Sequence, residues 1–301
     1  MSGMTDHQDQ PGGGVFSASG NIQGMAWIVM ASAVFAVNFT LIRKLGAEIH
    51  AFELVFFRNL FGFIFLIPFL IRAGRSGLMP SRPGLMALRG LMQTFALLFW
   101  YWALIVTPLA MAVSLSLLEP IFASIIAILV LREKSSPARW VVVVIGLLGS
   151  LIIIRPGFQA VSLGALSALA SAVFWGVFLI VGKVQTRSDS VISVVAYPTL
   201  LVVPLAVIPA AFFWQWPSLE QYFWLFMTGV LSSVAGLMFA KAYQVGDVTA
   251  VSPLSFSRLI FAAIVGFLFF SEIPEIWVWI GGAMIIAAGI YLGRIEARLA
   301  K

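Results

Sequence analysis

The chain has 301 residues, 61% of them hydrophobic and only 10% charged, and its mean hydropathy is +1.04. Soluble domains contain about 45–50% apolar and about 25% charged residues, so this composition excludes a water-soluble globular protein. A transmembrane β-barrel is excluded as well, because its strands alternate over about ten residues whereas the apolar runs here are continuous. The net charge of +6 comes from loop residues, so we expect no nucleic-acid partner.

The residue types that most catalytic and metal sites need are scarce. The chain has no cysteine, and its two histidines, His7 and His50, fall outside the apolar runs. No phosphate-binding loop, nucleophile-elbow motif or zinc-peptidase motif occurs in the sequence. We therefore expect no enzyme activity, no catalytic residue, no metal and no cofactor.

Ten apolar runs follow a short polar N-terminus. Residues 1–21 lack the apolar core of a signal peptide, and we expect a disordered cytoplasmic tail there. A membrane-spanning helix needs about 20 apolar residues, and runs near that length lie at 22–42, 52–71, 85–106, 109–131, 140–154, 162–182, 191–213, 221–242, 248–270 and 276–293. The sequence therefore predicts an all-α polytopic membrane protein with ten transmembrane helices and a second cytoplasmic tail at 295–301.

The basic residues are distributed unequally between the two sides of this arrangement. If the N-terminus is cytoplasmic, 13 Lys and Arg residues fall in cytoplasmic segments and three, Arg43, Lys44 and Arg155, fall on the opposite side. Cytoplasmic loops carry the excess of basic residues in membrane proteins. We expect a multi-pass protein of the cell inner membrane with both termini in the cytoplasm, in contact with lipid as a monomer or a homodimer.

Two pairs of segments are similar at one constant offset in the numbering. Seven of fourteen positions are identical between 31–44 and 170–183, and eleven of thirty-eight between 103–140 and 242–279. A constant offset over separate blocks indicates an internal duplication, with repeats that we place at 22–157 and 158–294. Because each repeat contains five spans, an odd number, the second is expected to be inverted relative to the first, as in many secondary transporters.

Two ionisable residues occupy equivalent positions inside the spans. Glu119 lies in the fourth span and Arg258 in the ninth, and the same offset relates their positions. An ionisable side chain inside a span is costly and is by default functional or paired. One interpretation is a structural ion pair between the repeats. The other is a binding site whose carboxylate takes an ammonium group and whose guanidinium takes a carboxylate. Both stay open at this point.

Further polar and aromatic residues share helical faces with these two. Ser116 lies one turn before Glu119, and Ser255 one turn before Arg258. A serine in a span usually bonds to its own helix, and Trp or Tyr near a span end usually marks the lipid interface. The alternative is that these side chains line a cavity. The candidate substrate-binding residues are Asn38, Gln93, Trp100, Tyr101, Ser116, Glu119, Trp175, Tyr243, Ser252, Ser255 and Arg258.

The runs EPIFASIIAILVLREK at 119–134 and RLIFAAIVGFLFFSEI at 258–273 resemble the drug/metabolite transporter superfamily, EamA type. The resemblance covers about residues 22–294 and implies a ten-helix transporter with two inverted repeats. It also implies that Glu133 and Glu272 are the glutamates that end the fourth helix of each repeat, and that Arg58 corresponds to an arginine the family carries in its second span. In length and in aromatic-rich spans the chain is most similar to the YddG-type aromatic amino-acid exporters.

We therefore expect a secondary transporter that exports amino acids or similar small metabolites, with aromatic amino acids favoured, by alternating access through a central cavity. An exporter of drugs, nucleosides or riboflavin-like compounds is the alternative within the same class. A channel or a lipid scramblase is the alternative from another class, and it would conduct without saturation.

Overall fold

The computed structural model describes residues 18–73, 81–130, 137–155, 162–185, 191–245 and 252–299. Every regular element in these ranges is helical, which confirms the all-α prediction. The elements are α1 (Ala18–Leu45), α2 (Ala51–Ala73), α4 (Pro83–Val106), α5 (Leu109–Ser116), α6 (Glu119–Val130), α7 (Pro137–Ile154), α8 (Leu163–Gln185), α9 (Val191–Ala210), α10 (Leu219–Val245), the 3₁₀ helix η1 (Ser252–Phe256), α12 (Ser257–Phe270) and α13 (Ile276–Leu299).

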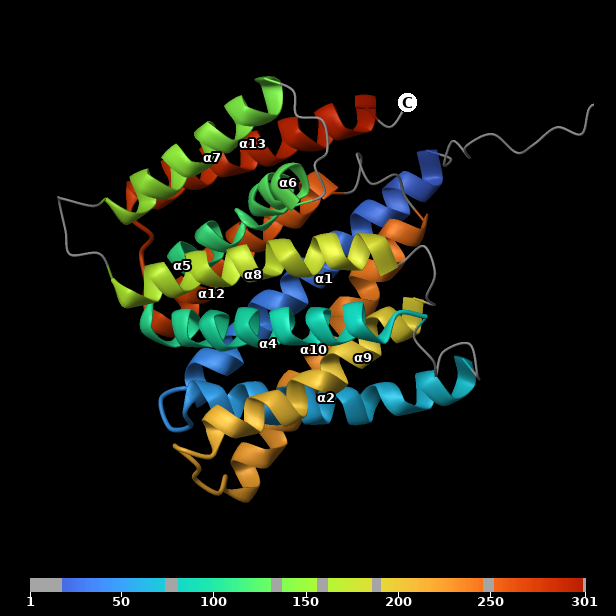
Figure 1. Ribbon diagram of the computed structural model, residues 1–301. Helices are drawn as coiled ribbons and strands as arrows, with labels where there is room; N and C mark the ends of the chain where they lie inside the picture. The colour runs from blue at the N-terminus through green and yellow to red at the C-terminus, as the bar shows by residue number, and fades with distance from the viewer. Residues whose placement is uncertain are drawn as a thin grey trace, which may run out of the picture.

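The helices match the ten apolar runs of the sequence. Within the described ranges, six helical segments are long and apolar enough to cross a membrane, and four shorter apolar helices complete the set. The fourth span combines α5 with α6, and the ninth combines η1 with α12. The N-terminal end of α1 and the C-terminal end of α13 lie at the same end of the bundle (Figure 1).

The first and last helices extend beyond the apolar runs. Helix α1 begins at Ala18 and α13 continues to Leu299, so both helices include residues that the sequence assigned to the terminal tails. The rest of the expected N-terminal tail, residues 1–17, lies outside the described part of the structure, and so does Glu133.

Equivalent helices of the two repeats end at equivalent positions in the sequence. Helix α4 ends at Val106 and α10 ends at Val245, which are equivalent positions under the offset that relates the two repeats. Helix α2 packs against α10, and their respective counterparts in the other repeat, α9 and α4, pack against each other. The fold is therefore built from two five-span repeats, in agreement with the prediction.

The fourth span is broken in its middle, whereas the ninth changes from a 3₁₀ helix to an α-helix without interruption. Helix α5 ends at Ser116, the chain turns through Leu117 and Leu118, and α6 begins at Glu119. In the second repeat, η1 ends at Phe256 and α12 begins at the next residue. Pro120 lies in the first turn of α6, where a missing backbone N–H costs nothing. This proline therefore begins a new helix instead of interrupting a continuous one.

Helices α7 and α13 lie side by side along one edge of the bundle (Figure 1). Their contact depends on two glycines, because a Cβ on Gly281 would meet the carbonyl oxygen of Gly149, and a Cβ on Gly149 would meet that of Gly281. Helix α1 contacts α4, α10, η1 and α12, so it packs against elements of both repeats.

Candidate functional site

Glu119 and Arg258 both lie at the starts of α-helices. Glu119 is the first residue of α6 and Arg258 is the second residue of α12, and both side chains are half-buried. The two charges are close enough to interact electrostatically. No ion pair within 4 Å joins them in the part of the chain that the structure describes. Glu119 and Arg258 therefore do not form the direct ion pair that one of the two interpretations required.

The helix dipole favours the charge of Glu119, because the positive end of the α6 dipole stabilises its carboxylate. Arg258 lies inside the ninth span, where a cation is costly without a nearby negative charge. Its Nε atom and the hydroxyl of the neighbouring Ser257 are buried without a hydrogen-bond partner. The arrangement leaves one acceptor group and one donor group able to contact a charged solute.

A second polar group forms around the hydroxyl of Ser232 on α10. Arg58 of α2 donates from Nε to this oxygen at 2.9 Å, and Asn38 of α1 donates from Nδ2 to the same oxygen at 2.8 Å. Tyr101 of α4 is close enough to interact electrostatically with Arg58. We call Asn38, Arg58, Tyr101 and Ser232 the Arg58 cluster. Asn38 Oδ1 and the Tyr101 hydroxyl are buried and have no hydrogen-bond partner.

The two candidate tryptophans belong to aromatic pairs. Trp100 is 6% exposed and packs edge-on against Phe39 of α1, with ring centroids 5.3 Å apart. Trp175 of α8 is half-buried and packs edge-on against Phe178 at 4.8 Å. The burial of Trp100 separates it from the interfacial belt, where tryptophan usually faces lipid headgroups.

The remaining candidates are not drawn together. The Ser116 hydroxyl donates to Val113 O at 2.8 Å within its own helix. Gln93 is buried with Oε1 unpartnered, and Ser255 is half-buried. The side chains of Tyr243 and Ser252 lie outside the described part of the structure.

The sequence did not place Arg58 or Ser232 among the substrate-binding candidates. An arginine inside an apolar run was the signal that could have identified this cluster.

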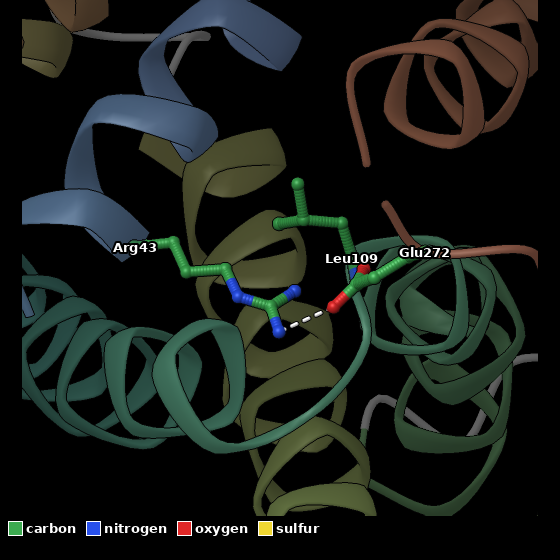
Figure 2. A network of polar contacts seen from close by, with 3 residues as sticks. All are labelled: Arg43, Leu109 and Glu272. Atoms are coloured by element: carbon green, nitrogen blue, oxygen red, sulfur yellow. Dashed lines mark hydrogen bonds and ion pairs between the residues drawn. The ribbon is translucent and has the colours of Figure 1, made fainter. Parts of the chain in front are cut away.

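An ion pair joins two helices at one end of the bundle, as Figure 2 shows. Arg43 at the end of α1 pairs with Glu272 just after α12, and the other carboxylate oxygen accepts the N–H of Leu109 at 2.9 Å. The Arg43 guanidinium also lies over the Phe270 ring, 4.6 Å from its centroid. This network ties α1, α5 and α12 together. We call this end of the bundle, which also carries Arg155, the Arg43 end.

The amino-acid sequence of this chain is similar to those of known transporters. The model of the EamA-like transporter family matches residues 22–155 and again residues 162–293. An S-adenosylmethionine uptake transporter of Rickettsia prowazekii is 28% identical over 90% of this chain and 92% of its own length. A riboflavin transporter of Vibrio cholerae is 28% identical over 93% and 96%, and a pseudopaline exporter of Pseudomonas aeruginosa is 30% identical over 91% and 96%.

A solved crystal structure supports the fold. It superposes with a TM-score of 0.62 over 94% of this chain and 99% of its own, at 19% identity. Such a likeness concerns the fold alone. The three transporters named above act on different small metabolites, and none of their names refers to an aromatic amino acid.

Proposed function

The chain belongs to the EamA-like transporter family, and on that premise we propose that its substrate is an amino-acid-derived metabolite, with S-adenosylmethionine as the first candidate. The family consists of transporters, so the chain is a multi-pass secondary transporter of small metabolites and not an enzyme. The proposal includes the inner membrane as its location and a cytoplasmic position for both termini.

The observation that carries the proposal is the position of Glu119. Its half-buried carboxylate begins α6 inside a broken span, and broken spans at mid-membrane are typical substrate sites of secondary transporters. In the proposed site, Glu119 faces the positively charged group of the substrate, which in S-adenosylmethionine is the sulfonium. Arg258 lines the same site and balances Glu119 when the substrate is absent.

The substrate also needs a contact for its adenine ring, which aromatic residues can supply. The adenine ring of S-adenosylmethionine needs a flat apolar contact, and the pairs around Trp100 and Trp175 offer such faces. The aromatic amino acids expected from the sequence share the aminocarboxylate of this compound but lack its sulfonium. They remain test compounds. A role of Gln93, Ser116, Tyr243, Ser252 and Ser255 in the site stays a prediction from the sequence.

Counterflow in proteoliposomes tests the proposal. Vesicles containing the purified protein are loaded with unlabelled S-adenosylmethionine, riboflavin or tryptophan, and entry of the matching labelled compound is followed. We expect saturable exchange of S-adenosylmethionine and its loss in Glu119→Gln. The exposed Arg72→Gln, on α2, serves as the matched control and should exchange normally. Flux that never saturates would support a channel or scramblase and contradict the proposal.

Riboflavin is the second candidate, favoured by relatives with that name at 26–29% identity. Riboflavin has an aromatic ring system and no fixed charge, so it would use the aromatic pairs and leave Glu119 unmatched. Exchange of riboflavin that survives Glu119→Gln would favour this candidate.

A further inference from the structure

Arg58 is a charged residue inside the second span. Its neighbours are the hydroxyl of Ser232 and the side-chain oxygen of Asn59, which accepts from Nη1 at 3.1 Å. Across the described ranges, no carboxylate lies within ion-pair distance of its guanidinium. A cation inside a span is costly when nothing offsets its charge. Arg258 differs, because it interacts with Glu119.

The guanidinium is held in one orientation. Nε is fixed by Ser232 and Nη1 by Asn59, whose own amide donates to Val55 O at 2.7 Å. The contacts of the described residues leave the second terminal nitrogen, Nη2, without a protein acceptor. An arginine oriented by its neighbours binds a carboxylate with little further loss of freedom.

Two buried polar atoms around this arginine also lack partners. The Tyr101 hydroxyl and Asn38 Oδ1 belong to side chains that are each 2% exposed. Buried polar groups are hydrogen-bonded in most structures, so an unpartnered group calls for an explanation. A hydroxyl can donate to a carboxylate oxygen, and an amide oxygen can accept from an ammonium group. Together with Arg58 Nη2 they match the two ends of an α-aminocarboxylate.

Arg58 and Glu119 lie at similar depths below the Arg43 end of the bundle. With a rise of 1.5 Å per residue, Arg58 lies about 10 Å and Glu119 about 15 Å inside the ends of their spans at the Arg43 end. Helix α1 carries Asn38 and also packs against η1 and α12, the elements of the Arg258 side.

We propose that the Arg58 cluster is the subsite for the aminocarboxylate end of the transported metabolite. This inference rests on the proposed function, because it needs a substrate that carries a carboxylate. Arg58 Nη2 and the Tyr101 hydroxyl bind the carboxylate oxygens, and Asn38 Oδ1 accepts from the ammonium group. Ser232 is a positioning residue that orients both Arg58 and Asn38.

The first experiment probes the subsite with acetate. The melting temperature of the purified protein in detergent is measured in sodium acetate and in sodium chloride of equal concentration. We expect acetate to stabilise wild type relative to chloride, because a ligand that binds the folded state raises its stability. Arg58→Gln should lose this difference and Arg72→Gln should keep it. Equal responses of wild type and Arg58→Gln would overturn the subsite, whatever the substrate is.

The second experiment measures binding of S-adenosylmethionine and of its carboxamide, in which the carboxylate charge is removed. We expect wild type to bind the carboxylate form about 10- to 100-fold more tightly, as for hydrogen bonds between charged groups. Arg58→Gln should bind both forms equally, and Arg58→Lys should recover part of the preference because it restores the charge without the planar fork. An unchanged preference in Arg58→Gln would overturn the assignment.

Two further outcomes separate the subsite from the proposed function. If acetate stabilises wild type but not Arg58→Gln and S-adenosylmethionine does not bind, the subsite is supported and the proposed substrate is wrong. If S-adenosylmethionine binds wild type and Arg58→Gln equally, the proposed substrate is supported and the subsite is wrong. Ser232→Ala keeps the charge of Arg58 and releases its Nε, so it should weaken the acetate response without abolishing it.

Discussion

The network at the Arg43 end makes a sharp prediction about stability. Glu272 has two roles there, since it pairs with Arg43 and accepts the N–H of Leu109. Arg43 pairs with Glu272 and lies over Phe270. Glu272→Ala removes the ion pair and also leaves a backbone N–H without its acceptor. Arg43→Ala leaves the bond between Glu272 and Leu109 in place. We therefore expect Glu272→Ala to be the more destabilising change.

The exposure of the pair sets the size of the effect. Breaking a buried pair costs about 3–5 kcal/mol, whereas exposed pairs contribute about 0–1 kcal/mol. Each of these side chains is 17% exposed, which places the pair between the two limits. We expect a loss of about 2–3 kcal/mol for Glu272→Ala and of about 1–2 kcal/mol for Arg43→Ala, the latter including the contact with Phe270.

Thermal unfolding in detergent, followed by tryptophan fluorescence, measures both variants and the double mutant. Because the two residues interact, the double mutant should lose less than the sum of the single losses. The pair of Arg155 and Glu275 is the control, with side chains 29% and 59% exposed and N–O atoms 3.2 Å apart. Equal losses at the two pairs, or additive losses at Arg43 and Glu272, would refute the reasoning.

Three other predictions follow from single features. Burial lowers the pKa of His50 below its usual 6.5, so the unfolded chain takes up the proton first and stability is lost as the pH falls below 6.5. Thermal melts between about pH 7.5 and about pH 5.5 should therefore show a larger loss in wild type than in His50→Asn. Gly281→Ala should destabilise the contact of α7 with α13, whereas Gly84→Ala, where a Cβ would meet nothing within 4 Å, should not, and the melting temperatures of the two variants decide this. A reporter that is active only in the cytoplasm should be active when fused after Lys301, and a fusion active only outside would overturn the orientation derived from the basic residues.

Most of the fold could be predicted from the sequence because lipid imposes a simple requirement on it. Each span must satisfy its backbone hydrogen bonds internally, so a long apolar run is a helix regardless of its neighbours. The constant offset between the repeats is enough to relate Glu119 to Arg258. The break of the fourth span before Glu119 was not predicted, because Pro120 fits both a kinked helix and the first turn of a new one.

The candidate site was harder to predict, because polar contacts between spans depend on how the helices rotate and pack. Arg58 and Ser232 are 174 residues apart, and nothing in either segment indicates that their side chains meet. The same is true of Arg43 and Glu272, which lie near opposite ends of the chain. Asn38 and Tyr101 were chosen for their chemistry, and the structure places both beside an arginine that sequence reasoning had left out of the site.

The central claim is that Glu119 faces the positively charged group of the substrate, and one measurement tests it directly. It compares the binding constants of S-adenosylmethionine and S-adenosylhomocysteine, which lacks the sulfonium charge, for wild type and for Glu119→Gln. We predict that wild type prefers S-adenosylmethionine by about 10- to 100-fold and that Glu119→Gln shows no preference. Equal binding of the two compounds by wild type, or a preference that persists in Glu119→Gln, would contradict the claim.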